Sequence, residues 1–157
     1  MTGRAIEALG QMSSHPPTTV LVGGSNPALA ELKDAASGLE DVEVVSDSRD
    51  VASLMAHADL AISAAGTTTW ELAAMRVPTL AVVCADNQSA AAAEMSRRGI
   101  VVVLGEAESV TSTVVAERVA SLAADVGRRR ALVDACRREF DGSGTERVVD
   151  YLLSESR

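Results

Sequence analysis

The sequence predicts an α/β domain of the Rossmann-like kind, a parallel sheet with helices on both faces. Short apolar runs alternate with amphipathic stretches from one end of the chain to the other. Hydrophobic residues make up 47% of the 157 residues but aromatic residues only 2%, and a core of small and β-branched side chains suits closely packed strands and helices. This length fits one domain, 1–157.

The expected elements follow one another in a regular order. The run from Thr79 to Cys84 is nearly all apolar, as in a strand buried on both faces. Asn26 precedes Pro27, a favourable pair for the start of a helix. Strands are predicted at 19–22, 42–45, 60–63, 79–84 and 100–104, and helices at 27–38, 49–58, 68–75, 87–98, 111–124, 128–139 and 145–153.

Charge and composition exclude several classes of partner. The net charge of −8 opposes polyanions, and the scarcity of aromatic residues removes stacking platforms, so no nucleic-acid partner is expected. No apolar run is long enough for a membrane span. Cys84 and Cys136 are interpreted as two buried reduced thiols, which indicates a cytoplasmic protein. His15 and His57 lie at no metal-ligand spacing, so neither a metal nor a cofactor is predicted.

The most informative segment runs from Ser63 to Glu71, where a strand delivers a small-residue turn into a helix. Ligands of open α/β sheets bind at the carboxyl ends of the strands, which is where this turn lies. Free backbone N–H groups at the helix start, together with the hydroxyls of Thr67, Thr68 and Thr69, would suit a diphosphate. The alternative is that Thr67 and Thr68 only cap the helix.

Two further sets of polar residues have alternative interpretations. Glu71 could complete a capping box with Thr68, or accept hydrogen bonds from the two hydroxyls of a ribose. Asp86, Asn87 and Gln88 follow the fourth strand and could hold sugar hydroxyls, or simply cap the next helix. The Gly23–Ser25 turn resembles a phosphate loop only weakly.

Two other enzyme classes lack support in the sequence. Asp59 stands at the amino end of its strand, the wrong edge of the sheet for the phosphate-accepting residue of a signalling receiver. Nucleophilic hydrolases of the G-x-S-x-G kind are excluded because the motif is absent.

The segments 58–72, 77–78 and 85–88 together resemble a known family. They are similar to the C-terminal half of the UDP-sugar hydrolase of pseudaminic acid biosynthesis and, more broadly, to the C-terminal domain of GT-B glycosyltransferases of the MurG kind. The resemblance extends to about Gly105. It implies that the diphosphate is held by Gly66, Thr67 and Thr68, the ribose by Glu71, the sugar by Asp86, Asn87 and Gln88, and the uracil by Val44 and Val45.

The resemblance also implies two missing parts. The family's proposed general base is a histidine of the N-terminal domain, so no catalytic residue is expected here. The family's first strand, central in the sheet, has no counterpart before the helix expected at 2–9. The chain is therefore interpreted as a fragment or a split subunit. Either the strand at Val20 closes against the strand at Leu60, or a partner domain or chain supplies the missing strand; a homo-oligomer is compatible with both.

Three functions follow from these implications. The first is the UDP-sugar-binding half of a UDP-sugar hydrolase of sialic-acid-like sugar biosynthesis. The second is the donor-binding subunit of a GT-B glycosyltransferase that a partner completes. The third is a nucleotide-sugar-binding module without catalytic activity. The sequence leaves all three open, along with an α/β domain that retains no site.

Overall fold

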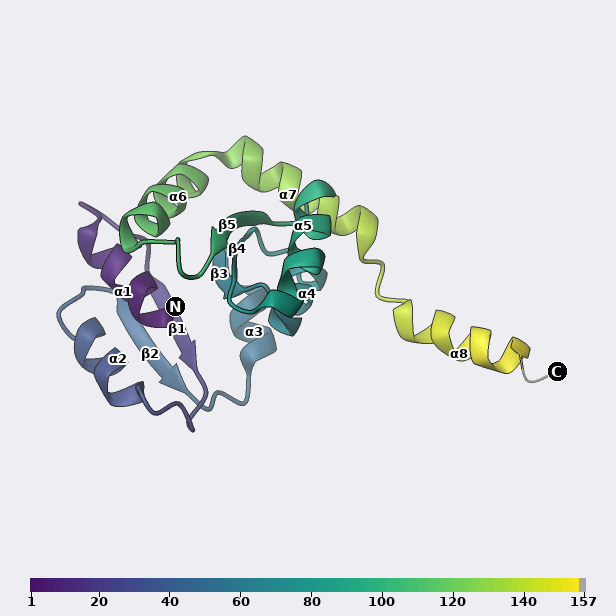
Figure 1. Ribbon diagram of the computed structural model, residues 1–157, viewed down its shortest axis with the longest axis horizontal. Coiled ribbons are helices and arrows are strands. Elements are labelled where there is room, and N and C mark those ends of the chain that lie inside the picture. The colour runs from purple at the N-terminus through teal and green to yellow at the C-terminus, as the bar shows by residue number, and fades with distance from the viewer. Residues whose placement is uncertain (156–157) are drawn as a thin grey trace.

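The computed structural model describes residues 1–155 and contains five strands among its helices (Figure 1). The strands are β1 (Thr18–Val22), β2 (Val42–Ser46), β3 (Ala61–Ala64), β4 (Thr79–Val83) and β5 (Val102–Glu106). The helices are α1 (Thr2–Gln11), α2 (Leu29–Ala36), α3 (Val51–Ala56), α4 (Thr67–Ala74), the short 3-10 helix η1 (Asp86–Gln88), α5 (Ser89–Arg97), α6 (Ser112–Ala124), α7 (Val126–Glu139) and α8 (Gly144–Glu155).

The strands form two parallel sheets, and the α/β fold class is confirmed. One sheet pairs β1 with β2, and Val20 lies opposite Val44. The other has the order β3-β4-β5, and Leu80 of the central strand lies opposite Ile62 and Val102. Every residue of β4 is buried, as its apolar run predicted. The strand bounds differ from the predicted ones by two residues at most.

Helices cover both faces of the β3-β4-β5 sheet. Leu80 and Val82 point into a cluster that includes residues of α1, α6 and α7. Ala81 and Val83 point to the opposite face, into a cluster with residues of α4, α5 and α7. The alternation along β4 therefore fills two cores at once, which is the packing of a parallel sheet between two helical layers.

The β1-β2 sheet is covered differently on its two faces. Val22 packs with Ile6 of α1 and Leu32 of α2 on one face. On the other face, Leu21 keeps 38% of its surface exposed, although it lies in the middle of a strand. Glu43 of β2 is exposed as well.

The two sheets are not joined by hydrogen bonds within residues 1–155. The expectation that the strand at Val20 closes against the strand at Leu60 is therefore wrong, because β1 pairs only with β2 and β3 only with β4. Packing through α1 links the two sheets instead. Ile6 belongs to the core of the β1-β2 sheet, whereas Ala8 belongs to the core of the β3-β4-β5 sheet.

The two cysteines differ in their surroundings. Cys136 is fully buried, and burial raises the pKa of its thiol. Cys84 is exposed just beyond the end of β4, so the prediction of two buried thiols is wrong for this residue. The apolar run that predicted its burial continues one residue past the strand, and the chain leaves the sheet there.

Two ion pairs of Arg98 connect α5 to the end of α7. Arg98 lies 2.6 Å from a carboxylate oxygen of Glu94 and 2.7 Å from one of Glu139. Hydrogen bonds from Arg97 and Arg98 lower the pKa of Glu94 to about 2. The arginines thereby keep Glu94 ionised in moderately acidic solution.

Helix α8 stands away from the rest of the chain at its C-terminal end (Figure 1). Val148, Val149, Tyr151 and Leu153 are all largely exposed on it. Neither α8 nor any other helix within residues 1–155 is long and apolar enough to cross a membrane.

Candidate functional site

The carboxyl ends of β3 and β4 lead directly into α4 and η1. Gly66 is the N-cap residue of α4, and no side chain caps this helix. Thr67 and Thr68 are exposed, and neither their backbone N–H groups nor their hydroxyls donate a hydrogen bond within residues 1–155. The start of α4 therefore presents unpaired donors at the edge of the sheet where parallel α/β proteins bind ligands.

Gln88 brings the loop after β4 beside the start of α4. Its side-chain oxygen accepts a hydrogen bond of 2.9 Å from the backbone N–H of Cys84. Its side-chain nitrogen would lie 3.6 Å from a Cβ placed on Gly66. The structure thus brings together two segments that the sequence predicted to share a site, the one beginning at Gly66 and the one ending at Gln88.

Thr69 does not share the exposure of the two threonines before it. Its side chain is only 1% exposed, and its hydroxyl donates a hydrogen bond of 2.8 Å to the carbonyl of Ala64. Its backbone N–H donates to the carbonyl of Gly66. The predicted ligand contact of Thr69 is therefore not possible in this arrangement, since the residue holds the turn between β3 and α4 instead.

Glu71 lies one turn into α4 with its carboxylate exposed. It makes no side-chain hydrogen bond and no ion pair within the part of the chain that the structure describes. The capping box with Thr68 is consequently not formed, because the N-cap of α4 is Gly66, two residues before the Thr68 that a capping box would require. The carboxylate is left available on the same helix as the free donors of Thr67 and Thr68.

The side chains of Asp86 and Asn87 are also exposed in η1. Neither caps the helix that follows, since α5 begins after Gln88 without a side-chain cap. The capping alternative for these two residues is therefore wrong, and both side chains lie exposed at the carboxyl end of β4.

Val44 and Val45 lie within β2, away from this group. Val44 packs against the cluster of Ile6, Val22 and Leu32 beneath α1 and α2. Val45 lies opposite Leu21 in the β1-β2 ladder. The structure does not bring either valine to the start of α4, and their assignment to the uracil stays a prediction.

The Gly23–Ser25 turn is tied to the loop after β2 by a contact that the sequence analysis missed. The backbone N–H of Gly24 donates a hydrogen bond of 2.7 Å to the Asp47 carboxylate. Asp47 itself adopts a left-handed backbone conformation, with φ of 51°. A carboxylate already occupies this turn, so the turn is a poor site for a phosphate.

Gly24→Ala is expected to lower the free energy of unfolding by about 1–2 kcal/mol, because it disrupts a hydrogen bond to a charged group. A Cβ on Gly24 would overlap the Asp47 carboxylate, so the Asp47 side chain would have to turn away and its hydrogen bond to Gly24 would be lost. The measurement is urea unfolding followed by circular dichroism. Gly23→Ala is the matched control, since nothing lies within 4 Å of a Cβ there. Equal stabilities of the two variants would contradict the role of the Gly24–Asp47 contact.

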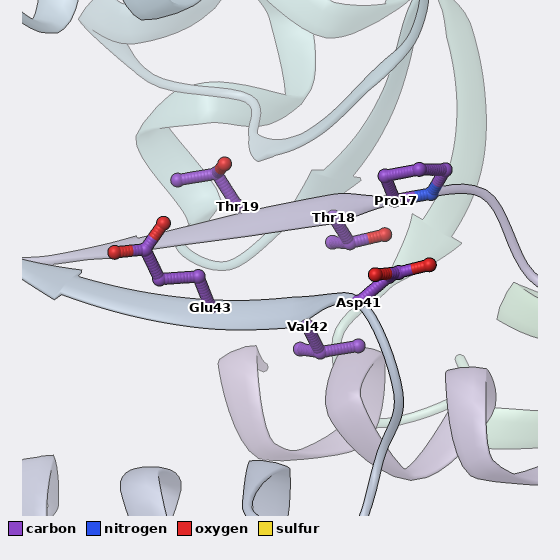
Figure 2. A pocket seen from close by; sticks show the side chains of 6 residues that line it. All are labelled: Pro17, Thr18, Thr19, Asp41, Val42 and Glu43. Carbon is purple, nitrogen blue, oxygen red and sulfur yellow. The ribbon is translucent and has the colours of Figure 1, made fainter.

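Two hollows on the surface lie at the amino ends of strands, which is the edge of the sheets opposite the start of α4. One, of about 410 Å³, lies at the amino ends of β1 and β2. Figure 2 shows that the side chains of Thr19 and Glu43 point to one side of the two strands, whereas that of Val42 points to the other side. The other, of about 450 Å³, includes Asp59 and Pro78. Because both lie at the amino ends of strands, we assign the candidate site to the start of α4 instead.

The single tryptophan of the chain lies on the same helix as the candidate site. Trp70 separates Thr69 from Glu71 on α4 and is 45% exposed. Its ring centroid lies 6.0 Å from that of Phe140, with the planes inclined by 58°. This tilted contact joins the site helix to the residue that follows α7.

Comparisons with known proteins agree with this fold. The structure resembles MurG of Acinetobacter baumannii with a TM-score of 0.77 and 20% identity, over 98% of this chain and 45% of that one. It resembles CalG4, the calicheamicin glycosyltransferase, with a TM-score of 0.69 and 23% identity, over 98% of this chain and 38% of that one. At these identities the likeness shows the fold, which is the C-terminal half of a GT-B glycosyltransferase.

A comparison with curated protein sequences gives no match. The family model of the glycosyltransferase family 28 C-terminal domain, however, matches residues 13–130, which is most of the chain. The chain spans less than half the length of MurG or CalG4. On the strength of the family match, the chain belongs to the glycosyltransferase family 28 C-terminal domain family.

Proposed function

We propose that this chain is the donor-binding half of a GT-B glycosyltransferase and holds a UDP-sugar at the start of α4. The observation that carries the proposal is the set of unpaired groups on that helix. Thr67 and Thr68 offer free backbone N–H groups and hydroxyls, and Glu71 offers a free carboxylate one turn later. The family match supports the transferase over the hydrolase that the resemblance first suggested.

Each group suits a different part of the ligand. The donors of Thr67 and Thr68 and the open backbone at Gly66 suit the diphosphate, since a helix start favours negative charge. The carboxylate of Glu71 suits the ribose, because it can accept hydrogen bonds from two neighbouring hydroxyls. Asp86, Asn87 and Gln88 lie at the end of the next strand and suit the hydroxyls of the sugar.

The chemistry assigned to this half is stabilisation of the leaving group. In the transfer, an acceptor hydroxyl attacks the anomeric carbon, the bond from that carbon to the β-phosphate oxygen breaks, and UDP leaves. Negative charge then increases on the diphosphate, where preorganised N–H donors are most effective. We assign no catalytic base to this chain, and the acceptor site and the base would belong to an N-terminal half.

Isothermal titration calorimetry with UDP tests the proposal. Wild type is expected to bind in the micromolar range, and Glu71→Ala to bind at least about tenfold more weakly, a loss of about 1.4 kcal/mol. Glu31→Ala is the matched control, because Glu31 is an exposed glutamate of α2 outside the site. It should leave the affinity unchanged.

The same titration with 2′,3′-dideoxy-UDP isolates the contact to the ribose. If Glu71 holds the ribose hydroxyls, Glu71→Ala should not weaken the binding of this analogue. Equal losses with both nucleotides would contradict the ribose assignment but not the site. Absence of UDP binding by a folded wild type would overturn the function proposed for the isolated chain and favour a half that needs its partner, or a domain without a site.

A further inference from the structure

The side chain of Gln88 is fixed in one orientation just beyond the end of β4. Its Oε1 atom accepts a hydrogen bond of 2.9 Å from the backbone N–H of Cys84. Its own backbone N–H donates to the carbonyl of Ala85, also at 2.9 Å. Gln88 is half-buried, whereas Asp86 and Asn87 are exposed. Much of the entropy that a ligand contact would take from this side chain is therefore already lost in the unbound chain.

The bond from Cys84 determines which end of the amide remains available. A backbone N–H can only donate, so the atom that it contacts must be the side-chain oxygen rather than the nitrogen. The Nε2 group of Gln88 lies at the other end and donates no hydrogen bond within residues 1–155. The available end of this side chain therefore presents N–H donors, while its oxygen is already paired.

These donors lie beside the start of α4. The Nε2 atom of Gln88 would be 3.6 Å from a Cβ placed on Gly66, the N-cap residue. The unpaired N–H groups of Thr67 and Thr68 follow directly in the chain. A ligand group at this point meets donors from two segments, and a phosphate satisfies them because its oxygens accept hydrogen bonds. A sugar hydroxyl brings a hydrogen of its own, for which the Gln88 amide offers no free acceptor.

We propose that Gln88 binds the diphosphate of the nucleotide sugar, together with Thr67 and Thr68, and that only Asp86 and Asn87 face the sugar. This inference rests on the proposed function and narrows it, because that function gives all three residues of η1 to the sugar. Asp86 suits the sugar better, since a carboxylate accepts the hydrogens that sugar hydroxyls donate. The Gln88 donors would instead act on the leaving group, whose negative charge increases during the transfer.

The variant Gln88→Glu reverses the polarity of the available end without changing its size. One carboxylate oxygen can still accept from Cys84, while the other replaces the donors with a negatively charged acceptor. The probe is UDP, which has the diphosphate but no sugar. Isothermal titration calorimetry at about pH 7.5 should show an affinity at least about 100-fold below wild type, a loss of about 2.7 kcal/mol. If Gln88 contacted the sugar alone, UDP would bind equally well to both proteins, and the inference would be overturned.

Two further variants separate the contact from the added charge. Ala90→Glu places the same charge on an exposed residue of α5 and should weaken UDP binding by no more than about threefold, because solvent screens it. Gln88→Met removes the donors without adding a charge and should weaken binding by about tenfold. Equal losses in Ala90→Glu and Gln88→Glu, or full affinity in Gln88→Met, would overturn the inference.

The pH dependence of Gln88→Glu provides a measurement that general damage to the site would not change. A protonated glutamate is neutral and has an O–H group that can donate to the diphosphate. A bound anion raises the ordinary glutamate pKa of about 4.3, so lowering the pH from about 7.5 to about 5 should reduce the difference in affinity from wild type by at least about threefold. A difference that stays constant over this range would contradict a direct contact.

Nuclear magnetic resonance with inorganic pyrophosphate tests the contact without a nucleotide. The side-chain N–H signals of Gln88 in the wild-type chain should shift to saturation, whereas those of Gln11, which donates to Ser112, should not. Unchanged UDP affinity in Gln88→Glu would overturn this inference and leave the proposed function standing. Absence of UDP binding by wild type beside saturable shifts at Gln88 would do the reverse. Absence of both would overturn both.

Discussion

Gly66→Asp is expected to abolish UDP binding while leaving the domain at least as stable as wild type. An aspartate at the N-cap accepts hydrogen bonds from the first N–H groups of the helix, which are the groups assigned to the diphosphate. It also places a negative charge where the ligand carries its own. Calorimetry should show an affinity at least about 100-fold lower, a loss of about 2.7 kcal/mol. The Tm should be unchanged or higher.

The backbone at Gly66 permits this substitution. Its φ of −99° and ψ of −156° are accessible to any residue, and the nearest atom to an added Cβ is the Gln88 side-chain nitrogen. Gly66→Asn is the matched control, because it can cap the helix without the charge and should weaken binding less. UDP affinity that survives Gly66→Asp would mean that the diphosphate lies elsewhere.

Leu80→Ala is expected to cost about 2–5 kcal/mol of the free energy of unfolding, because it leaves a cavity in a packed core. Leu80 is 1% exposed in the central strand β4 and packs among residues of α1, α6 and α7. Urea unfolding should show a lower midpoint with an unchanged slope.

Leu21→Ala is the control for this loss, since Leu21 is a strand leucine with 38% of its surface exposed. Its substitution should cost no more than about 1 kcal/mol. Similar losses for the two variants would mean that the exposed face of β1 is packed in solution.

The sequence predicted the strands and helices because they depend on local patterns. The apolar run from Thr79 identified the central strand, and the small-residue turn at Gly66 identified a helix start at the carboxyl edge. The sequence could not predict whether Glu71 forms a capping box with Thr68, because a capping box depends on which residue is the N-cap of the helix. The N-cap lies at Gly66, two residues before Thr68, and the Glu71 carboxylate is therefore not used in a capping box.

The remaining differences depend on contacts between distant parts of the chain. Three consecutive threonines look alike in sequence, but the path of the turn buries Thr69 and exposes its two neighbours. The Gly24–Asp47 contact joins residues 23 positions apart. The pairing of β1 likewise depends on which edges meet in space. Apolar periodicity identifies a strand but not its neighbours.

The contact between Trp70 and Phe140 provides the domain with a spectroscopic reporter of its own. Trp70 is the only tryptophan in the chain, so all indole emission comes from a single position on α4. That position is next to Glu71, and its ring packs against Phe140 just after α7. The fluorescence spectrum therefore reports both on helix α4 and on its contact with the end of α7, without any added label.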